Sequence, residues 1–365
     1  MFGSNVPYPA LLNPELADLK AYVPDLNEYP IRLDANEAPA FENSIVNEHL
    51  TRVLSNTRWE KYPDPTATAL REALAKRCGA FPDELLVGVG SDELITLLMA
   101  GVNQSEGAHN PPTVLTFSPT FVMYKMSAKV RGYRVVEVPL DEHWDIAEKS
   151  VLLALETAPP NLLFIASPNN PTGNLMSRDR LERVLDAAPN TVCIVDEAYI
   201  DYAHTTQMDL RKRFPNLIIM RTLSKIGFAS LRVGWMIGPR ALMQELNKAR
   251  LPYNISTVSQ TLATAVVTDL YAHVAELIDR VTAERDRLAT EISGLDGYSI
   301  TPSEANFLWI RTPKPAQCVY EFLKSQGILV RSFHERGGRL AHQLRITVGS
   351  AIQNDRLLES LARHQ

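Results

Sequence analysis

Short, continuous apolar runs that alternate with longer amphipathic stretches are the feature that most constrains the fold of this chain. The apolar runs are rich in Val, Ile and Leu, as is typical of strands that are covered on both faces of a parallel sheet. Between them, stretches such as 68–77 and 177–187 repeat apolar residues at helical spacing. The alternation predicts an α/β fold with a mostly parallel sheet flanked by helices. The seven expected strands are 85–87, 113–117, 134–138, 162–166, 192–195, 217–220 and 233–237.

The pattern changes after residue 256. A long helical stretch at about 258–293 is followed by short apolar runs near 307–310, 328–330 and 344–348, and by a last helix at 354–363. This order predicts a second, smaller α+β domain. Prolines are frequent up to about Thr57, which favours an extended surface arm. We therefore expect an N-terminal arm (1–30), a small domain (31–55 and 257–365) and a large domain (56–256).

Composition disfavours several classes of protein. The net charge of −5 argues weakly against a nucleic-acid binder, and no apolar stretch approaches the roughly 18 residues that span a bilayer. The first ten residues lack the pattern of a secretory signal. The cysteines Cys78, Cys193 and Cys318 are odd in number, far apart and not in metal-ligand spacing. We expect a reduced, cytoplasmic protein with no nucleic-acid partner, no membrane partner and no metal site.

The first chemical motif is Thr222-Leu223-Ser224-Lys225, which follows the expected strand 217–220. Ligands of open α/β sheets bind at the carboxyl ends of the strands. A lysine amine placed there can form an imine with an aldehyde. Ser224 and Arg232 could both reach a phosphate group. Taken alone, a lysine at this position is more often a solvated loop residue.

The second and third motifs also follow strands. Asp196 directly follows the apolar run 192–195. A carboxylate buried at the end of a strand needs a partner. A protonated pyridine nitrogen would supply one; the alternative, a magnesium site, lacks the phosphate-binding loop that usually accompanies it. Tyr199 could hydrogen-bond a phenolic oxygen on the same ring. Asn170 lies in the Ser167–Gly173 string, whose plain interpretation is a tight loop, and it could donate to the same oxygen.

The fourth motif, from Gly88 to Glu93, joins a strand to an apolar helix. Gly90, Ser91 and Asp92 could hold a phosphate on the backbone N–H groups of the helix N-terminus. The alternative is an ordinary helix cap, with Ser91 or Asp92 at the N-cap. Glu93 occupies the place of the third glycine of a dinucleotide-binding motif, which disfavours that class.

The four motifs and their order along the chain resemble those of the fold type I pyridoxal-phosphate aminotransferases. The resemblance is strongest to the histidinol-phosphate branch. The resemblance extends over nearly the whole chain, from Leu33 to Gly349, and implies a seven-stranded large domain with a smaller α+β C-terminal domain. Further strings that carry it are Leu33-Asp34-Ala35-Asn36-Glu37, Lys61-Tyr62-Pro63-Asp64, Ser118-Pro119-Thr120-Phe121 and Leu344-Arg345-Ile346-Thr347-Val348-Gly349.

The resemblance implies a role for each matching residue. Lys225 would form the Schiff base to pyridoxal phosphate and carry the transferred proton. Asp196 would pair with the pyridine nitrogen, and Phe121 would stack on the ring. Tyr62 would reach the cofactor phosphate from a second subunit, which implies a homodimer. The other cofactor contacts would be Gly90, Ser91, Asp92, Ser224 and Arg232 at the phosphate, and Asn170 and Tyr199 at the ring oxygen.

On the substrate side, the resemblance assigns Arg345 to a carboxylate and Arg331 to the phosphate of histidinol phosphate, with Tyr22 and Asn36 nearby. The expected reaction is transamination between L-histidinol phosphate and 2-oxoglutarate, a step of histidine biosynthesis. Three alternatives stay open from the sequence. They are an aromatic amino-acid aminotransferase, a threonine-phosphate decarboxylase and a non-catalytic binding protein on the same fold.

Overall fold

The computed structural model describes residues 12–19, 21, 23, 25–41, 44–102 and 111–364. Its larger sheet contains all seven predicted strands, and their ends lie within two residues of the expected positions, so the predicted sheet is confirmed. Of its seven strands, β8 alone runs in the opposite direction to the others. In the sheet the order is β2-β8-β7-β6-β5-β3-β4, with bounds β2 Leu85–Val89, β3 Thr113–Ser118, β4 Arg134–Pro139, β5 Leu162–Ala166, β6 Val192–Asp196, β7 Leu217–Thr222 and β8 Val233–Ile237.

Alternate side chains of these strands enter different apolar layers. Ile194 and Ile218 pack with helices on one face, and their neighbours Cys193 and Leu217 pack with helices on the other. Burial on both faces explains why the strands are continuously apolar. One layer contains α4 (Gly90–Gly101), α5 (Met123–Val130) and α8 (Arg240–Asn247), and the other contains α6 (Glu148–Thr157) and α7 (Arg178–Asp186), with α3 (Thr68–Cys78) on the β2 and β8 side.

The parallel strands place the site. In the register of the sheet, Ala166 at the end of β5 lies opposite Asp196 at the end of β6, and Asp196 lies opposite Met220 in β7. The loops that follow these strands therefore leave the sheet side by side at one edge.

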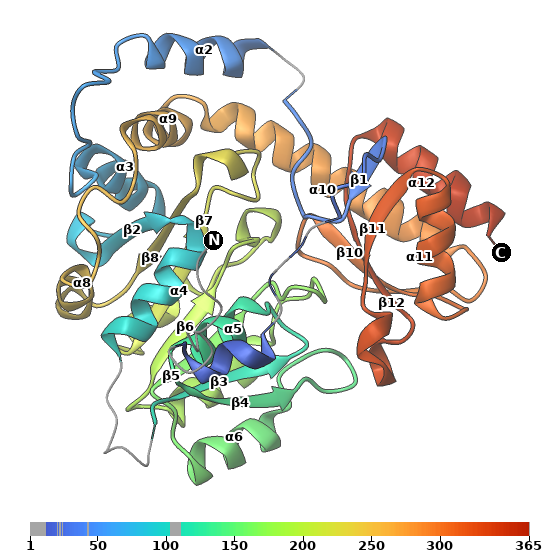
Figure 1. The fold of residues 1–365 in the computed structure, drawn as a ribbon, viewed down its shortest axis with the longest axis horizontal. Coiled ribbons are helices and arrows are strands. Elements are labelled where there is room, and N and C mark those ends of the chain that lie inside the picture. Colours follow the sequence, from blue (N-terminus) through green and yellow to red (C-terminus); the bar gives the residue numbers. More distant parts are fainter. Residues whose placement is uncertain are drawn as a thin grey trace, which may run out of the picture.

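A second sheet of five strands forms the other lobe (Figure 1). Its strand order is β1-β11-β12-β10-β9, and only the β1–β11 pair is parallel. The C-terminal strands and helix predicted from the sequence are confirmed here. The elements are β1 Ile31–Leu33, β9 Ser299–Thr301, β10 Phe307–Arg311, β11 Ile328–Ser332, β12 Gln343–Thr347, α10 Tyr271–Ser293, α11 Ala316–Ser325 and α12 Ala351–Arg363.

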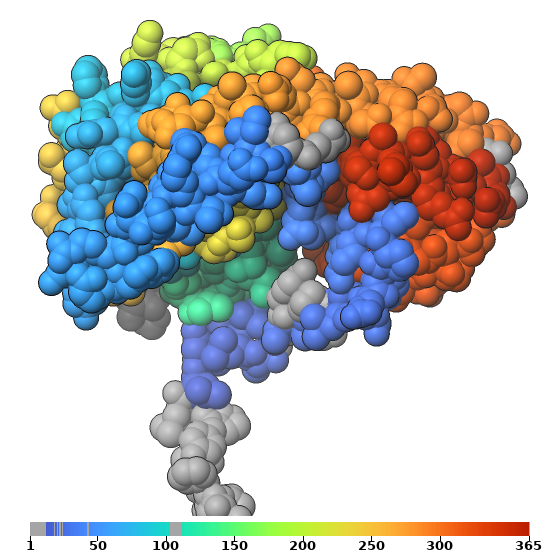
Figure 2. Space-filling model, turned by 90° about the horizontal axis from the view of Figure 1, so that it is seen from above, coloured from blue at the N-terminus to red at the C-terminus, as the bar shows by residue number. Residues whose placement is uncertain are grey.

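The expectation of an extended arm up to Thr57 is wrong for residues 31–54. Ile31–Leu33 pairs with β11, and α2 (Ser44–Leu54) packs against α9 (Thr257–Thr268). Figure 2 shows α2 lying over α9. Pro30 and Pro39 flank these two elements without entering them, so they interrupt neither. Pro7, Pro9 and Pro24 lie outside the described residues.

The predicted long helix at 258–293 is two helices, α9 and α10, with a bend of 76° between them. Leu270, at the corner, is buried in the same core as both helices. The helical repeat of apolar residues therefore continues across the bend, which is why the sequence pattern did not reveal it. Within the described ranges, no single helix is long and apolar enough to cross a membrane; this pair passes that test only jointly.

Short 3-10 helices complete the described elements: η1 Pro14–Asp18, η2 Pro82–Glu84, η3 Ile200–Tyr202, η4 Met208–Lys212, η5 Ala229–Leu231, η6 His334–Arg336 and η7 Gly338–Leu340. The predicted division into arm, small domain and large domain stays a prediction. We propose that these boundaries hold, because each of the two lobes contains a sheet of its own.

Candidate active site

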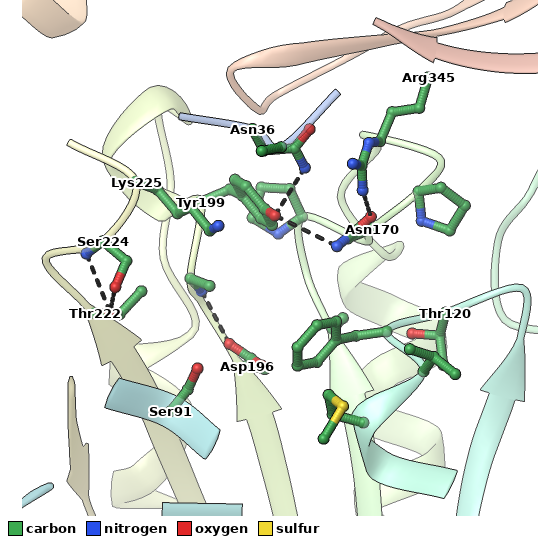
Figure 3. Close-up of a pocket in the computed structure, with 18 of the residues that line it drawn as sticks. Asn36, Ser91, Thr120, Asn170, Asp196, Tyr199, Thr222, Ser224, Lys225 and Arg345 are labelled. Atoms are coloured by element: carbon green, nitrogen blue, oxygen red, sulfur yellow. Dashed lines mark hydrogen bonds between the residues drawn. The ribbon is translucent and has the colours of Figure 1, made fainter. Parts of the chain in front are cut away.

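A cavity of about 370 Å3 opens at the carboxyl edge of the large sheet, and strands of both sheets contribute to its lining. This volume lies within the usual range of small-molecule sites. Most of the residues predicted for the site line this single cavity, and Figure 3 shows several of them converging. They are Lys225, Asp196, Tyr199, Asn170, Ser91, Asp92, Phe121, Ser224, Arg232, Arg345, Arg331 and Asn36.

Three predicted residues are not in this lining. Tyr62 is 82% exposed and stacks on Tyr253 with ring centroids 4.8 Å apart. Tyr22 lies outside the described residues. Gly90 is buried at the start of α4, where an added Cβ would lie 2.6 Å from Nη2 of Arg232. Its φ of 72° also favours glycine, and the absence of a side chain leaves space for that guanidinium.

Asp196 is the buried acid of the site, with 4% exposure. Its Oδ2 accepts a hydrogen bond from the hydroxyl of Tyr124 at 2.6 Å, and its Oδ1 accepts one from the N–H of Ala198 at 3.0 Å. Burial raises the pKa of Asp196 to about 6, although both hydrogen bonds and the nearby Lys225 act to lower it. A carboxylate buried away from water is stabilised by a cationic partner.

Lys225 lies in the turn after β7, and its amine enters the cavity beside Tyr199 (Figure 3). The Nζ atom is 5.7 Å from the centroid of the Tyr199 ring. The buried Tyr202, at the end of η3, donates a hydrogen bond from its hydroxyl to the Lys225 carbonyl at 2.6 Å. The main chain of the lysine is thus anchored, while its side chain projects toward a ligand.

A chain of hydrogen bonds crosses the cavity (Figure 3). The Tyr199 hydroxyl accepts from Nδ2 of Asn36 at 2.9 Å and from Nδ2 of Asn170 at 3.4 Å. Oδ1 of Asn170 in turn accepts from Nη1 of Arg345 at 2.7 Å. Because the Tyr199 oxygen receives two donors, its own proton is directed elsewhere. This chain gives Asn36, whose role the sequence left open, a defined partner.

At the start of α4 the structure corrects one expectation. The N-cap is Val89 rather than Ser91 or Asp92, and the Val89 N–H donates to the carboxylate of Glu93 at 2.5 Å. Ser91 and Asp92 therefore belong to the first helical turn, whose backbone N–H groups have no partner within the helix. Nη2 of Arg232 is 3.2 Å from Oδ2 of Asp92, a half-exposed ion pair of small energetic weight.

Backbone contact fixes this turn against the sheet. Gly234 of β8 is so close that a Cβ there would lie 2.6 Å from the Gly90 carbonyl carbon and 2.8 Å from the Ser91 nitrogen. On the other side, the N–H of Ser224 donates to Oγ1 of Thr222 at 3.1 Å. A helix N-terminus, a serine and an arginine thus meet at one end of the cavity, which is the usual composition of a phosphate site.

This donor set fits pyridoxal phosphate. The cavity provides an amine for an aldehyde, a buried acid for a pyridine nitrogen and an anion-binding end, and the side chain that Gly90 lacks would crowd that end. Within the described ranges, no group of three His, Cys, Asp or Glu side chains could hold a metal ion.

Sequence reasoning missed two tyrosines that support the site. Tyr124 lies one helical turn beyond Phe121, and Tyr202 lies three residues beyond Tyr199. Both are fully or almost fully buried, and their hydroxyls bond to Asp196 and to the Lys225 carbonyl. Neither spacing predicts those partners, because each contact joins separate elements.

Comparisons with known proteins agree with this geometry. The family model for aminotransferase class I and II matches residues 28–361. The chain is 38% identical to the histidinol-phosphate aminotransferase of Aquifex aeolicus over 95% of this chain and 96% of that protein. It is 35% identical to that of Thermoanaerobacter pseudethanolicus, over 96% and 97% of the two chains.

One solved structure is the histidinol-phosphate aminotransferase of Sinorhizobium meliloti in complex with pyridoxal-5'-phosphate. It superposes with a TM-score of 0.84 at 24% identity and covers 97% of each chain. The fold type expected from the sequence is thereby confirmed.

The buried acid generates a prediction for the cofactor-free protein. The folded pKa of Asp196 is about 6 and its ordinary value is 3.8, so the folded state keeps a proton that the unfolded state releases between these values. Stability therefore falls as pH rises through this window, by roughly 3 kcal/mol in total. We expect Asp196→Asn to be more stable than the wild type at pH 8, by up to about 3 kcal/mol.

Urea unfolding at pH 4 and at pH 8 measures this difference, which should shrink toward zero at pH 4. Asp279→Asn, at an exposed position of α10, is the control and should leave the pH slope unchanged. If the free energies of unfolding of Asp196→Asn and the wild type differ by the same amount at both pH values, the raised pKa of Asp196 is contradicted.

Proposed function

This chain belongs to the class I and II aminotransferase family, and on that premise we propose that it transfers the amino group of L-histidinol phosphate to 2-oxoglutarate. The products are imidazole-acetol phosphate and L-glutamate. The observation that carries this proposal is that Asp196 at the end of β6, Lys225 after β7 and Arg345 within β12 line one cavity, although their strands belong to two sheets. The curated relatives named above support the choice of substrate.

Pyridoxal phosphate, when bound, supplies an aldehyde for the amine and a protonated ring that accepts the electron pair released when the substrate Cα–H bond breaks. Lys225 supplies the amine that holds the cofactor. With the substrate amine in its place, the Nζ atom of Lys225 would be the base that takes the proton from the substrate α-carbon and passes it to the former aldehyde carbon of the cofactor. The hydrogen bond to the Lys225 carbonyl fixes the main chain from which this amine extends.

The remaining cofactor contacts have separate tasks. Asp196 would pair with the ring nitrogen, which would also give its buried charge a partner. The hydroxyl of Tyr199 and the amide of Asn170 would bind the ring oxygen, and Phe121 would stack on the ring. The phosphate would be held by the first turn of α4, with Gly90, Ser91 and Asp92, and by the side chains of Ser224 and Arg232.

Two arginines recognise the substrate. Arg331 of β11 and Arg345 of β12 are direct cross-strand partners, and both line the cavity. Like charges opposite each other destabilise a strand pair, so an anionic substrate between them offsets a repulsion. We assign Arg345 to the carboxylate of glutamate or 2-oxoglutarate and Arg331 to the phosphate of histidinol phosphate. Asn36 and Tyr22 belong to the same proposed substrate site.

The proposal includes a homodimer and a cytoplasmic location. The exposed ring of Tyr62 lies outside the cavity of its own chain, which supports a role at the cofactor phosphate of a second copy. Cys78, Cys193 and Cys318 are all free thiols, as expected for a reducing compartment.

The visible spectrum of the purified protein tests the core of the proposal. Pyridoxal phosphate should produce a yellow absorption band that L-histidinol phosphate bleaches and 2-oxoglutarate restores. Lys225→Ala should give no such band. A band that bleaches only with phenylalanine or another unphosphorylated amine would overturn the substrate, and no band in the wild type would overturn the cofactor.

Arg331 generates a test of specificity. Arg331→Gln removes a charge-assisted contact worth about 2–3 kcal/mol, so kcat/KM for histidinol phosphate should fall about a hundredfold. For L-histidinol, which lacks the phosphate, kcat/KM should change less than about threefold. Arg311→Gln, at the exposed end of β10 and outside the cavity, is the matched control. An equal loss for both amines would rule out phosphate recognition by Arg331.

Hybrid dimers test the role of Tyr62. Lys225→Ala and Tyr62→Ala are each expected to impair activity. When they are mixed and allowed to exchange subunits, half of the dimers become hybrids with one intact site, which restores about a quarter of the wild-type sites. If activity does not rise on mixing, Tyr62 does not act across subunits.

A further inference from the structure

A buried phenol lies behind the acid of the site. Tyr124 of α5 has no exposed surface, and its hydroxyl is 2.6 Å from Oδ2 of Asp196. Its ring stacks on Phe164 with centroids 4.8 Å apart and meets Phe121 edge-on at 5.5 Å. These contacts hold the ring, and therefore the hydroxyl, at a single position.

We propose that Tyr124 is a positioning residue that keeps the Asp196 carboxylate ionised and turned toward the ring nitrogen of the cofactor. This inference rests on the proposed use of pyridoxal phosphate but not on the identity of the amino donor.

The geometry supports orientation. The two carboxylate oxygens of Asp196 each accept one hydrogen bond, Oδ2 from Tyr124 and Oδ1 from the N–H of Ala198. Donors on both oxygens fix the plane of the carboxylate. Since Asp196 also lines the cavity, its other lone pairs are available to a ligand there.

The hydrogen bond from Tyr124 favours the ionised form of Asp196 against the effect of burial. Burial favours the neutral acid, and the charge of Asp92 on α4 acts in the same direction. Tyr124, the Ala198 N–H and Lys225 after β7 favour the carboxylate. Burial and the neighbouring Asp196 also raise the pKa of Tyr124 well above its ordinary value, so the phenol remains a donor.

Without this hydroxyl the carboxylate would become a stronger base and would compete with the ring nitrogen for the proton. The ring would then be a weaker acceptor of electrons, because its nitrogen would be partly neutral. A purely structural hydroxyl would affect stability alone. The protonation of the ring nitrogen therefore separates the two roles.

The experiment uses the full-length protein loaded with pyridoxal phosphate carrying 15N in the ring. In the wild type, the 15N chemical shift should report a protonated nitrogen. In Tyr124→Phe, which keeps the stacked ring, the shift should move toward the neutral form and the Kd for pyridoxal phosphate should rise about tenfold or more.

Tyr133→Phe is the matched control. Tyr133 is also buried, but its hydroxyl bonds to the Met99 carbonyl at 2.7 Å, away from Asp196. Its removal should lower thermal stability and leave both cofactor readouts unchanged. Incorporating 3-fluorotyrosine at Tyr124, which strengthens the donor at nearly constant volume, covers the case in which that variant does not fold. It should lower the pKa of Asp196 in the cofactor-free protein below that of the wild type, as read from the 13C shift of the carboxyl carbon.

An unchanged 15N shift in Tyr124→Phe overturns the positioning role even if activity falls. If that variant does not fold, an unchanged Asp196 pKa in the fluorinated protein overturns it. If the wild type binds the labelled cofactor and Tyr124→Phe moves the 15N shift as expected, but the wild type does not react with histidinol phosphate, the inference stands and the substrate proposal fails. If the wild type binds no pyridoxal phosphate, both fail.

Discussion

Because β5, β6 and β7 run in parallel, the polar groups that follow them leave the sheet at one edge. Asn170, Asp196 and Lys225 are separated by about 30 residues each along the sequence and still line a single cavity. The five-stranded sheet supplies the opposite wall with Arg331 and Arg345. The site therefore depends on strand direction more than on any local segment.

That arrangement has an energetic cost at its centre. Asp196 keeps a carboxylate in a dry position at the end of a fully apolar strand, where a neutral residue would be more stable. The chain limits the cost with two hydrogen bonds and provides an amine nearby. A bound cationic ring would remove the rest, so cofactor binding and folding are expected to support each other.

Much of this could be predicted from the sequence because its signals are local. The seven strands appear as apolar runs; Asp196 directly follows one, and Asn170 and Lys225 lie within five residues of the end of another. The bend before α10 could not be predicted, since apolar spacing continues across Leu270. Nor could the hydrogen bonds of Tyr124 and Tyr202, which depend on how α5 and η3 pack against other elements. The short strand β1 gave too little pattern, because only Leu33 of its three residues is buried.

Asn36 illustrates how narrowly one position can be specified. Its backbone is left-handed, with φ of 56°, and its buried amide donates to the Tyr199 hydroxyl while its N–H donates to Oγ1 of Thr347. Glycine would accept this backbone but has no amide, and glutamine has the amide but strains the backbone. Asparagine satisfies both demands, so very few other residue types could replace it. This restriction applies although the residue lies in an irregular segment far from Lys225 along the chain.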